Sequence, residues 1–435
     1  MPKLDEVDAS GPLVLETAYG PLSAERSRAI LTALANETGA SDILLRHLAL
    51  EQAVTDSPLV VGNKVTLLRD GPATYKSMYQ AISEAKSSIN IEVYILENDE
   101  MGKQLVEVLA ARQESGIQVN LMYDSIGSMH TPPEFFQRLT DAGANVVEFN
   151  PVNPAKARKD WIVDHRDHRK LTIIDGQIAF TGGINFSSVY SGGSFSRPKR
   201  TSGLDKVPWR DTQVRIEGPV VAEFQKLFLE TWEKQKGDPL PPKRYLVHID
   251  RKGNQIVRAV GSTPDSKISI LHTTLLSAIA HAERSIHLTN AYFVPDENLL
   301  DEIKAAARRG VDVQLLLPGR TDFWAPLYAG RSHYSALLKA GVKIYERQDA
   351  LLHAKTAVID GVWSTVGSSN LDSRSFATND EIDAVVLGED FAEQMEAMFQ
   401  ADIAEATAVT PEQWAHRGLG TRMKETAARL FERWL

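Results

Sequence analysis

An internal repeat constrains the fold of this 435-residue chain more than any other feature. Residues 81–124 and residues 278–319 both read as a helix, an apolar strand, a second helix with apolar residues at i, i+3 and i+4, and another apolar strand. Gly116 and Gly310 stand where each second helix should end, a position that favours glycine. This alternation favours βαβ units and a largely parallel sheet in each copy.

The repeat continues through residues 168–187 and 353–372. Each segment reads as a strand, an Asp-Gly turn (Asp175-Gly176 and Asp360-Gly361), a second strand and a loop of small residues. Asp-Gly between two apolar runs is a strong hairpin signal. The chain is therefore expected to contain two copies of one α/β unit.

The organisation around these copies follows from composition and spacing. A Pro-rich polar linker at 234–245 separates them. We expect a helical N-terminal extension at 1–59, two lobes at 60–240 and 241–409, and a C-terminal amphipathic helix at 410–435. The expected apolar face of that last helix consists of Met423, Ala427, Leu430, Phe431, Trp434 and Leu435. It could pack on the protein or lie on a membrane surface.

The chemistry is expected at His168 with Lys170 and at His353 with Lys355. Side chains at i and i+2 of a strand point the same way, so each segment places an imidazole beside an ammonium. A nucleophile or acid next to a fixed positive charge suits phosphate chemistry. Asp175 and Asp360 complete the same motif, but at Asp-Gly turns they are expected to shape the hairpins rather than touch substrate.

Further polar residues follow in both copies. The small-residue loops 182–185 and 367–370 can bring backbone N–H groups close to a phosphate, and they end in Asn185 and Asn370. We expect these two amides and Ser368 to bind phosphate. Asp211 and Glu381 begin the next strands, and a carboxylate that accepts from an imidazole Nδ1–H would fix its tautomer.

These residues resemble the phospholipase D superfamily, whose signature is a duplicated His-x-Lys-x4-Asp with a downstream Asn. Within it, RDHRKLTIIDG, TGGINFS, WRDTQVRIEGP and LHAKTAVIDG are most similar to bacterial cardiolipin synthases. The resemblance covers roughly residues 60–404. It implies two pseudo-symmetric α/β/α lobes with mixed sheets and one site at their interface. It also implies phosphatidyl transfer from phosphatidylglycerol through a phosphohistidine, with no metal or cofactor. His168 is favoured as the nucleophile, and peripheral contact with the cytoplasmic face of a bacterial inner membrane is expected.

Composition limits the possible mechanisms and substrate classes. No cysteine is present, which excludes a thiol nucleophile, and the net charge of −9 argues against broad binding of nucleic acid. No nucleic-acid partner is expected, and a phospholipid hydrolase is a stronger alternative than a nuclease. No signal peptide or membrane-spanning helix is expected. Basic residues between 156 and 210 could form a solvated loop. The oligomeric state is left open.

Overall fold

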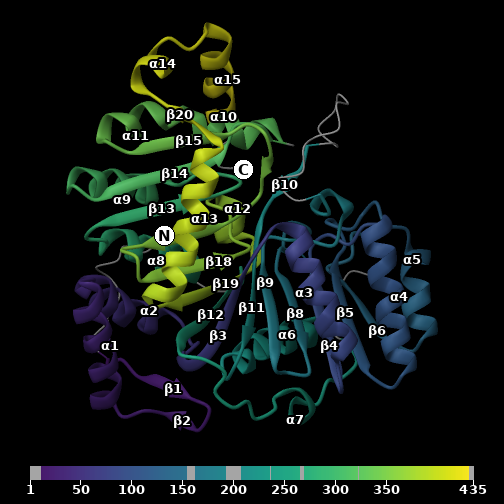
Figure 1. Cartoon of the computed structure of the whole chain (residues 1–435). Coiled ribbons are helices and arrows are strands. Elements are labelled where there is room, and N and C mark those ends of the chain that lie inside the picture. The colour runs from purple at the N-terminus through teal and green to yellow at the C-terminus, as the bar shows by residue number, and fades with distance from the viewer. Residues whose placement is uncertain are drawn as a thin grey trace.

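The chain folds into two α/β halves that lie side by side, with an N-terminal extension against the second half (Figure 1). The computed structural model describes residues 11–153, 162–192, 207–235, 237–264, 269–321 and 323–430. Strands of both halves join in one mixed sheet, because β3 and β12 pair antiparallel where the halves meet. The expected fold class, duplicated α/β halves with mixed sheets, is confirmed.

The two halves have equivalent strand orders around the β3–β12 pair. From the outer edge inward, the first half contains β6 (Asn145–Phe149), β5 (Gln118–Asp124), β4 (Ser88–Val93), β8 (Lys170–Ile174), β9 (Ile178–Gly182), β11 (Thr212–Glu217) and β3 (Leu59–Arg69). The second half contains β20 (Ala406–Val409), β15 (Lys343–Arg347), β14 (Asp312–Pro318), β13 (Ser285–Thr289), β17 (Thr356–Ile359), β18 (Trp363–Gly367), β19 (Asn379–Leu387) and β12 (Gln255–Ser262).

The expectation of a largely parallel sheet is wrong. Among the strands named above, parallel pairing is confined to β4–β5–β6 and β13–β14–β15, which are connected through helices. The strands nearer the centre pair antiparallel, because the Asp-Gly turns return the chain at once. Asp175 and Gly176 have φ of 56° and 64°, and Asp360 and Gly361 have 54° and 64°, as a type I′ hairpin turn requires.

Helices cover both faces of the sheet and divide the core into three layers. Outer helices of the first half are α3 (Asp70–Glu84), α4 (Glu100–Glu114) and α5 (Pro133–Asp141), and those of the second half are α8 (Ile270–Ala280), α9 (Glu297–Arg308) and α11 (Tyr334–Ala340). The middle layer contains α6 (Val221–Lys234) and α13 (Glu389–Ala404), whose aromatic and aliphatic side chains share one cluster. This shared cluster ties the halves together.

Helix ends follow the local sequence signals. Gly116 and Gly310 follow α4 and α9 with φ of 90° and 95°, which confirms the predicted glycine stops. Ser23 caps α1 (Ala24–Thr38) by accepting from the Arg26 N–H.

The N-terminal extension packs mainly on the second half. After α1, a π-helical turn (Ile43–His47) leads into α2 (Leu48–Val54), and its leucines join the core around α8. Glu51 forms a fully buried ion pair with Arg258 of β12 at 2.9 Å. Two short strands that the sequence did not predict, β1 (Leu15–Thr17) and β2 (Gly20–Pro21), extend the sheet beside β3.

The C-terminal region differs from the single helix expected. It forms α14 (Pro411–Ala415) and α15 (Leu419–Leu430), and α15 packs on α10 (Trp324–Ser332) with Ala428 in the contact. Met423 and Leu430 of the predicted apolar face are instead 72% and 78% exposed. Phe431, Trp434 and Leu435 lie outside the described residues. The face that packs is thus not the predicted apolar one.

Candidate active site

Two short parallel strand pairs bring the histidines together from opposite halves. β7 (Arg166–Asp167) pairs with the start of β19, and β10 (Trp209–Arg210) pairs with β16 (Leu351–Leu352). The His168 N–H donates to the Asp380 carbonyl at 2.9 Å, and the His353 N–H donates to the Arg210 carbonyl at 2.8 Å. Each histidine is therefore held by the backbone of the other half.

The carboxylates beside the histidines cross between the halves in the same way. His168 Nδ1 lies 3.0 Å from both carboxylate oxygens of Glu381. His353 Nδ1 lies 2.7 Å from Asp211 Oδ2. Both pairs are buried, so each imidazole is oriented by a group that the other copy of the repeat supplies. The sequence singled out all four residues but did not indicate this exchange.

A lysine accompanies each imidazole, as the strand period predicts. Lys355 Nζ lies 2.9 Å from Nδ1 and 3.1 Å from Nε2 of His353. Lys170 Nζ donates to the backbone carbonyl of His168 and lies 5.1 Å from the centre of the Tyr94 ring. Burial lowers the pKa of the Lys170 ammonium to about 7.

Burial and these lysines hold both imidazoles in the neutral form. Burial lowers the pKa of His168 well below its ordinary value, and Lys170 and Lys355 lower it further. Burial and Lys355 also lower the pKa of His353, although Asp211 acts in the opposite direction. Burial raises the pKa of the Glu381 carboxyl to about 7. An anion between the imidazoles would shift this balance toward the protonated forms.

The histidines open into one pocket of about 430 Å³ between the halves. Tyr94 lies edge-on to His168 at 4.9 Å, and Trp209 lies 5.2 Å from His353, both between ring centres. The pocket is lined by Tyr94, Ile95, Ile126, Arg166, His168, Asn185, Trp209, Tyr292, Phe323, Pro326, His353, Asn370, Asp372, Arg374, Ser375 and Asn379. Its size and its mixture of aromatic and polar walls are typical of a small-molecule site.

Asn185 and Asn370 both border this pocket. The Asn185 side-chain oxygen accepts from the Ile95 N–H at 3.0 Å, which turns its amide nitrogen toward the Tyr190 hydroxyl, 3.2 Å away. Tyr190 belongs to a 3-10 turn (Ser188–Tyr190), and its hydroxyl lies 3.4 Å from His353 Nδ1. Asn185 is thus fixed with its amide donor next to the tyrosine that contacts His353.

Ser368, which was predicted to bind phosphate, lies next to Glu381. Its hydroxyl donates to Glu381 Oε2 at 2.5 Å and accepts from the Ile382 N–H at 3.0 Å. The side chain is fully buried behind the carboxylate and does not border the pocket. In this structure the Ser368 hydroxyl therefore supports Glu381, and its predicted contact with phosphate stays a prediction.

The motif aspartates lie at the hairpins and anchor the neighbouring strands. Asp175 accepts from the backbone N–H groups of residues 86–88 at 2.7 to 3.0 Å. Asp360 accepts from those of residues 283–285 at 2.7 to 3.0 Å. Each carboxylate thus ties the hairpin to the start of β4 or β13, and neither borders the pocket.

Three arginines of the basic stretch are buried rather than solvated. Arg210 forms an ion pair with Asp402 of α13 at 2.7 Å, and Arg169 donates to the Thr231 hydroxyl and to backbone carbonyls of the second half. Arg166 borders the pocket. The interpretation as a solvated loop is wrong for these three. Lys156, Arg158, Lys159, Arg197, Lys199, Arg200 and Lys206 lie outside the described residues.

Arg166 and Arg374 are site residues that the sequence reasoning missed. A signal for Arg166 was available in the sequence. Arg166, His168 and Lys170 are spaced by two residues, and side chains at that spacing on a strand point to the same face. Arg374 had no comparable signal, since it lies in a short helix (Ser373–Ala377) whose orientation the tertiary structure sets.

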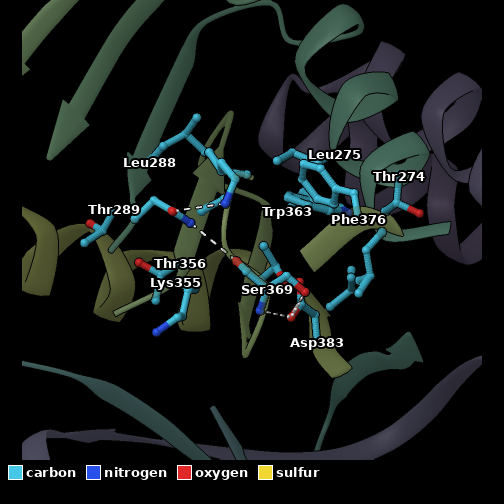
Figure 2. Close-up of a pocket in the computed structure, with 16 residues that line it drawn as sticks. Thr274, Leu275, Leu288, Thr289, Lys355, Thr356, Trp363, Ser369, Phe376 and Asp383 are labelled. Carbon is cyan, nitrogen blue, oxygen red and sulfur yellow. Dashed lines mark hydrogen bonds between the residues drawn. The ribbon is translucent and has the colours of Figure 1, made fainter. Parts of the chain in front are cut away.

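A second pocket lies within the second half, beside Lys355 (Figure 2). Its volume is about 40 Å³, and Leu275, Leu288, Trp363 and Phe376 form much of its apolar wall. The Lys355 ammonium points away from Trp363 and Phe376 in this view. A cavity of this size holds a water molecule or two rather than a substrate. The larger pocket between the halves is therefore the candidate site.

Duplicated α/β halves that contribute one His-Lys pair each to a shared pocket define a protein of the phospholipase D type. A family model described as "Cardiolipin synthase, PLD-like domain" matches residues 78–191 and 275–403. The chain therefore belongs to this family of phospholipase D superfamily enzymes.

Curated relatives and a solved structure agree with this assignment. A cardiolipin synthase of Geobacillus sp. (strain WCH70) is 34% identical over 388 residues, covering 88% of this chain and 75% of the relative. The "Probable cardiolipin synthase YwiE" of Bacillus subtilis (strain 168) is 31% identical over 370 residues, covering 85% and 72%. A crystal structure of phosphatidylserine synthase from Haemophilus influenzae Rd KW20 has the same fold, with a TM-score of 0.66, 14% identity and coverage of 88% and 99%.

Proposed function

We propose that this enzyme is a phosphatidyltransferase that joins two phosphatidylglycerol molecules into cardiolipin and releases glycerol. The names of the curated relatives support this reaction. The proposed lobes are residues 60–240 and 241–409, with the site between them. The crossed His168–Glu381 and His353–Asp211 pairs carry the proposal, because they put two oriented imidazoles from different lobes in one pocket.

The reaction proceeds in two displacements. One imidazole attacks the donor phosphorus, the P–N bond forms and the P–O bond to the glycerol headgroup breaks. The other imidazole donates a proton to the departing oxygen. It then takes the proton of the incoming hydroxyl, whose oxygen attacks phosphorus as the P–N bond breaks. The family resemblance favours His168 as the nucleophile.

The buried lysines and amides stabilise the transferring phosphoryl group. Lys170 and Lys355 provide positive charge where negative charge develops, in a site from which bulk water is largely removed. Asn185 and Asn370 are proposed to donate to the non-bridging oxygens. The lysines lower the pKa values of the imidazoles, and the negative charge of the bound phosphodiester opposes this effect. One imidazole can therefore hold the proton that the leaving group needs.

The products formed from labelled phosphatidylglycerol in bilayers test this proposal. Cardiolipin with one glycerol per turnover is the expected result. Phosphatidic acid as the main product would instead identify a phospholipid hydrolase, in which water replaces the second lipid. An absence of lipid turnover together with nucleic-acid cleavage would reject both.

We further propose that the protein contacts the membrane peripherally, at the cytoplasmic face of the bacterial inner membrane. Among the described residues, no helix has the length and apolarity needed to cross a bilayer. Phe323, which borders the pocket, and Trp324 are 50% and 55% exposed at the start of α10. Met423 and Leu430 are exposed on α15, which packs on α10. Apolar side chains near the mouth of a lipid site suit shallow insertion into a bilayer.

Vesicle sedimentation tests this surface. Trp324→Asp is expected to reduce binding to phosphatidylglycerol vesicles about tenfold, since one large apolar side chain contributes about 1.5–3 kcal/mol on burial. Tyr19→Asp provides the control, because Tyr19 is exposed on the N-terminal extension. Equal binding of both variants would reject this surface.

A further inference from the structure

The pocket contains two arginines that the proposed chemistry at the histidines leaves without a role. Arg166 is only 2% exposed and borders the pocket from β7. Arg374 is exposed and borders it from α12 (Ser373–Ala377). Because β7 pairs with the strand that follows α12, both arginines belong to the same side of the pocket.

The Arg166 guanidinium is incompletely satisfied by the protein. Nη1 donates to the Ser125 hydroxyl at 2.9 Å and to the Asn150 carbonyl at 3.2 Å, and it lies 3.7 Å from Asp124 Oδ2. Nε and Nη2 are buried and have no hydrogen-bond partner within the described part of the chain. A buried guanidinium with two unpaired nitrogens is costly, and an anion bound in the adjoining pocket would offset part of that cost through its charge.

Both arginines influence Tyr94, which also borders the pocket. Burial raises the pKa of the Tyr94 hydroxyl to about 12, and Arg374 and Arg166 both oppose this rise. The Tyr94 ring lies 4.9 Å from His168. Arg166 and Arg374 thus border the same pocket as Tyr94 and His168.

The acidic groups near the two arginines differ in what they contact, and Arg166 has one close acidic partner, Asp124. Asp372, the acidic residue that borders the pocket, accepts from the Ser375 N–H as the cap of α12, and burial raises its pKa to about 7. Burial also raises the pKa of Asp124, although Arg166 lowers it. Asp380 pairs with His165 at 3.0 Å. Among the residues that the structure describes, Arg374 takes part in no ion pair, although its charge lowers the pKa of Asp372.

We propose that Arg166 and Arg374 form a second phosphate subsite, separate from the His-Lys centre, that binds the phosphodiester of the acceptor lipid. This inference rests on the proposed function. The donor phosphate occupies the histidines, and the glycerol that leaves carries no charge. A second phosphate therefore enters the pocket only with the acceptor, so a site for it favours a phospholipid over water as the second substrate.

Competition between two acceptors tests the subsite. Phosphatidylglycerol vesicles are supplied with 1-butanol, and cardiolipin and phosphatidylbutanol are measured together. Both products need the same donor, but only cardiolipin needs an acceptor with a phosphate. Arg374→Gln is expected to lower the ratio of cardiolipin to phosphatidylbutanol about tenfold, which is the usual loss for a charge-assisted contact to phosphate. Arg28→Gln, on the exposed face of α1, is expected to keep the wild-type ratio.

A conservative second variant keeps the subsite testable if a charge-removing change at the buried Arg166 were to disturb folding. Arg166→Lys keeps the charge but removes the planar donor set, and it is also expected to lower the ratio. An unchanged ratio in Arg374→Gln and a folded Arg166→Lys would overturn the subsite. Equal loss of both products would overturn it too, because the arginines would then serve the donor. If the wild-type enzyme forms neither product, the proposed function itself fails.

Discussion

The side of the pocket around His168 and the side around His353 are built from equivalent strands but carry different side chains. The β7–β19 pair presents Arg166 and Asn379 beside His168. The matching β10–β16 pair contains Trp209 and Leu351 beside His353. The two copies therefore share the backbone arrangement and the imidazoles, but their flanking strand pairs differ, with Arg166 near His168 and Trp209 near His353. A symmetric scaffold can in this way bind two chemically different parts of its substrates.

The largest effect is expected from the histidines themselves, where the two sides should be equivalent. His168→Ala and His353→Ala should each reduce cardiolipin formation by more than about 10⁴-fold, because neither half is a site alone. Only one of them should still form a covalent phosphatidyl adduct, detectable by intact-protein mass spectrometry. Near-normal activity in either variant would contradict a shared site.

Substitutions of the crossed carboxylates should affect the two histidines differently. Asp211→Asn and Glu381→Gln are each expected to reduce the rate about 10²- to 10³-fold through loss of imidazole orientation. Asp211 acts to raise the pKa of His353, so Asp211→Asn should lower that pKa further and leave His168 much less affected. A histidine NMR titration measures both. A larger change at His168 would mean that the pairing does not cross.

The alkaline limit of the pH–activity profile should be set by Lys170, on the His168 side of the pocket. Burial lowers the pKa of Lys170 to about 7, so its positive charge is present below pH 7 and lost above it. We expect kcat/KM to fall as the pH rises through about 7. The acid limit should lie below the ordinary histidine value, since both imidazole pKa values are lowered.

Lys170→Arg sharpens this pH test. An arginine stays charged, so the alkaline limit should move up even though the maximal rate falls about tenfold through altered geometry. A pH–rate profile of wild type and variant measures the shift. An unchanged alkaline limit would assign it to another group.

The smallest effect on catalysis is expected at the motif aspartates. Asp360 is buried and accepts three backbone hydrogen bonds, so Asp360→Asn should lower the free energy of unfolding by about 1–3 kcal/mol. Asp175→Asn should cost less, because Asp175 is partly exposed. Urea unfolding and activity at low temperature provide the two measurements. A loss of activity in a fully folded variant would give these residues a catalytic part.

Much of the molecule could be predicted because its signals are local. The glycine stops at Gly116 and Gly310 and the Asp-Gly turns depend on backbone preferences within a few residues. The shared face of His168 and Lys170 follows from strand periodicity alone. The repeat then predicted two equivalent halves, since equal local patterns fold into equal local structures.

Only the tertiary structure decided which residues meet. The His168–Glu381 and His353–Asp211 pairs are separated by 213 and 142 positions, and they form because the antiparallel β3–β12 pair joins the halves. The same packing places Ser368 behind Glu381 and turns Arg166 and Arg374 toward one pocket. Local sequence encodes the direction of a side chain on its own strand. The group that it faces depends on the packing of distant strands.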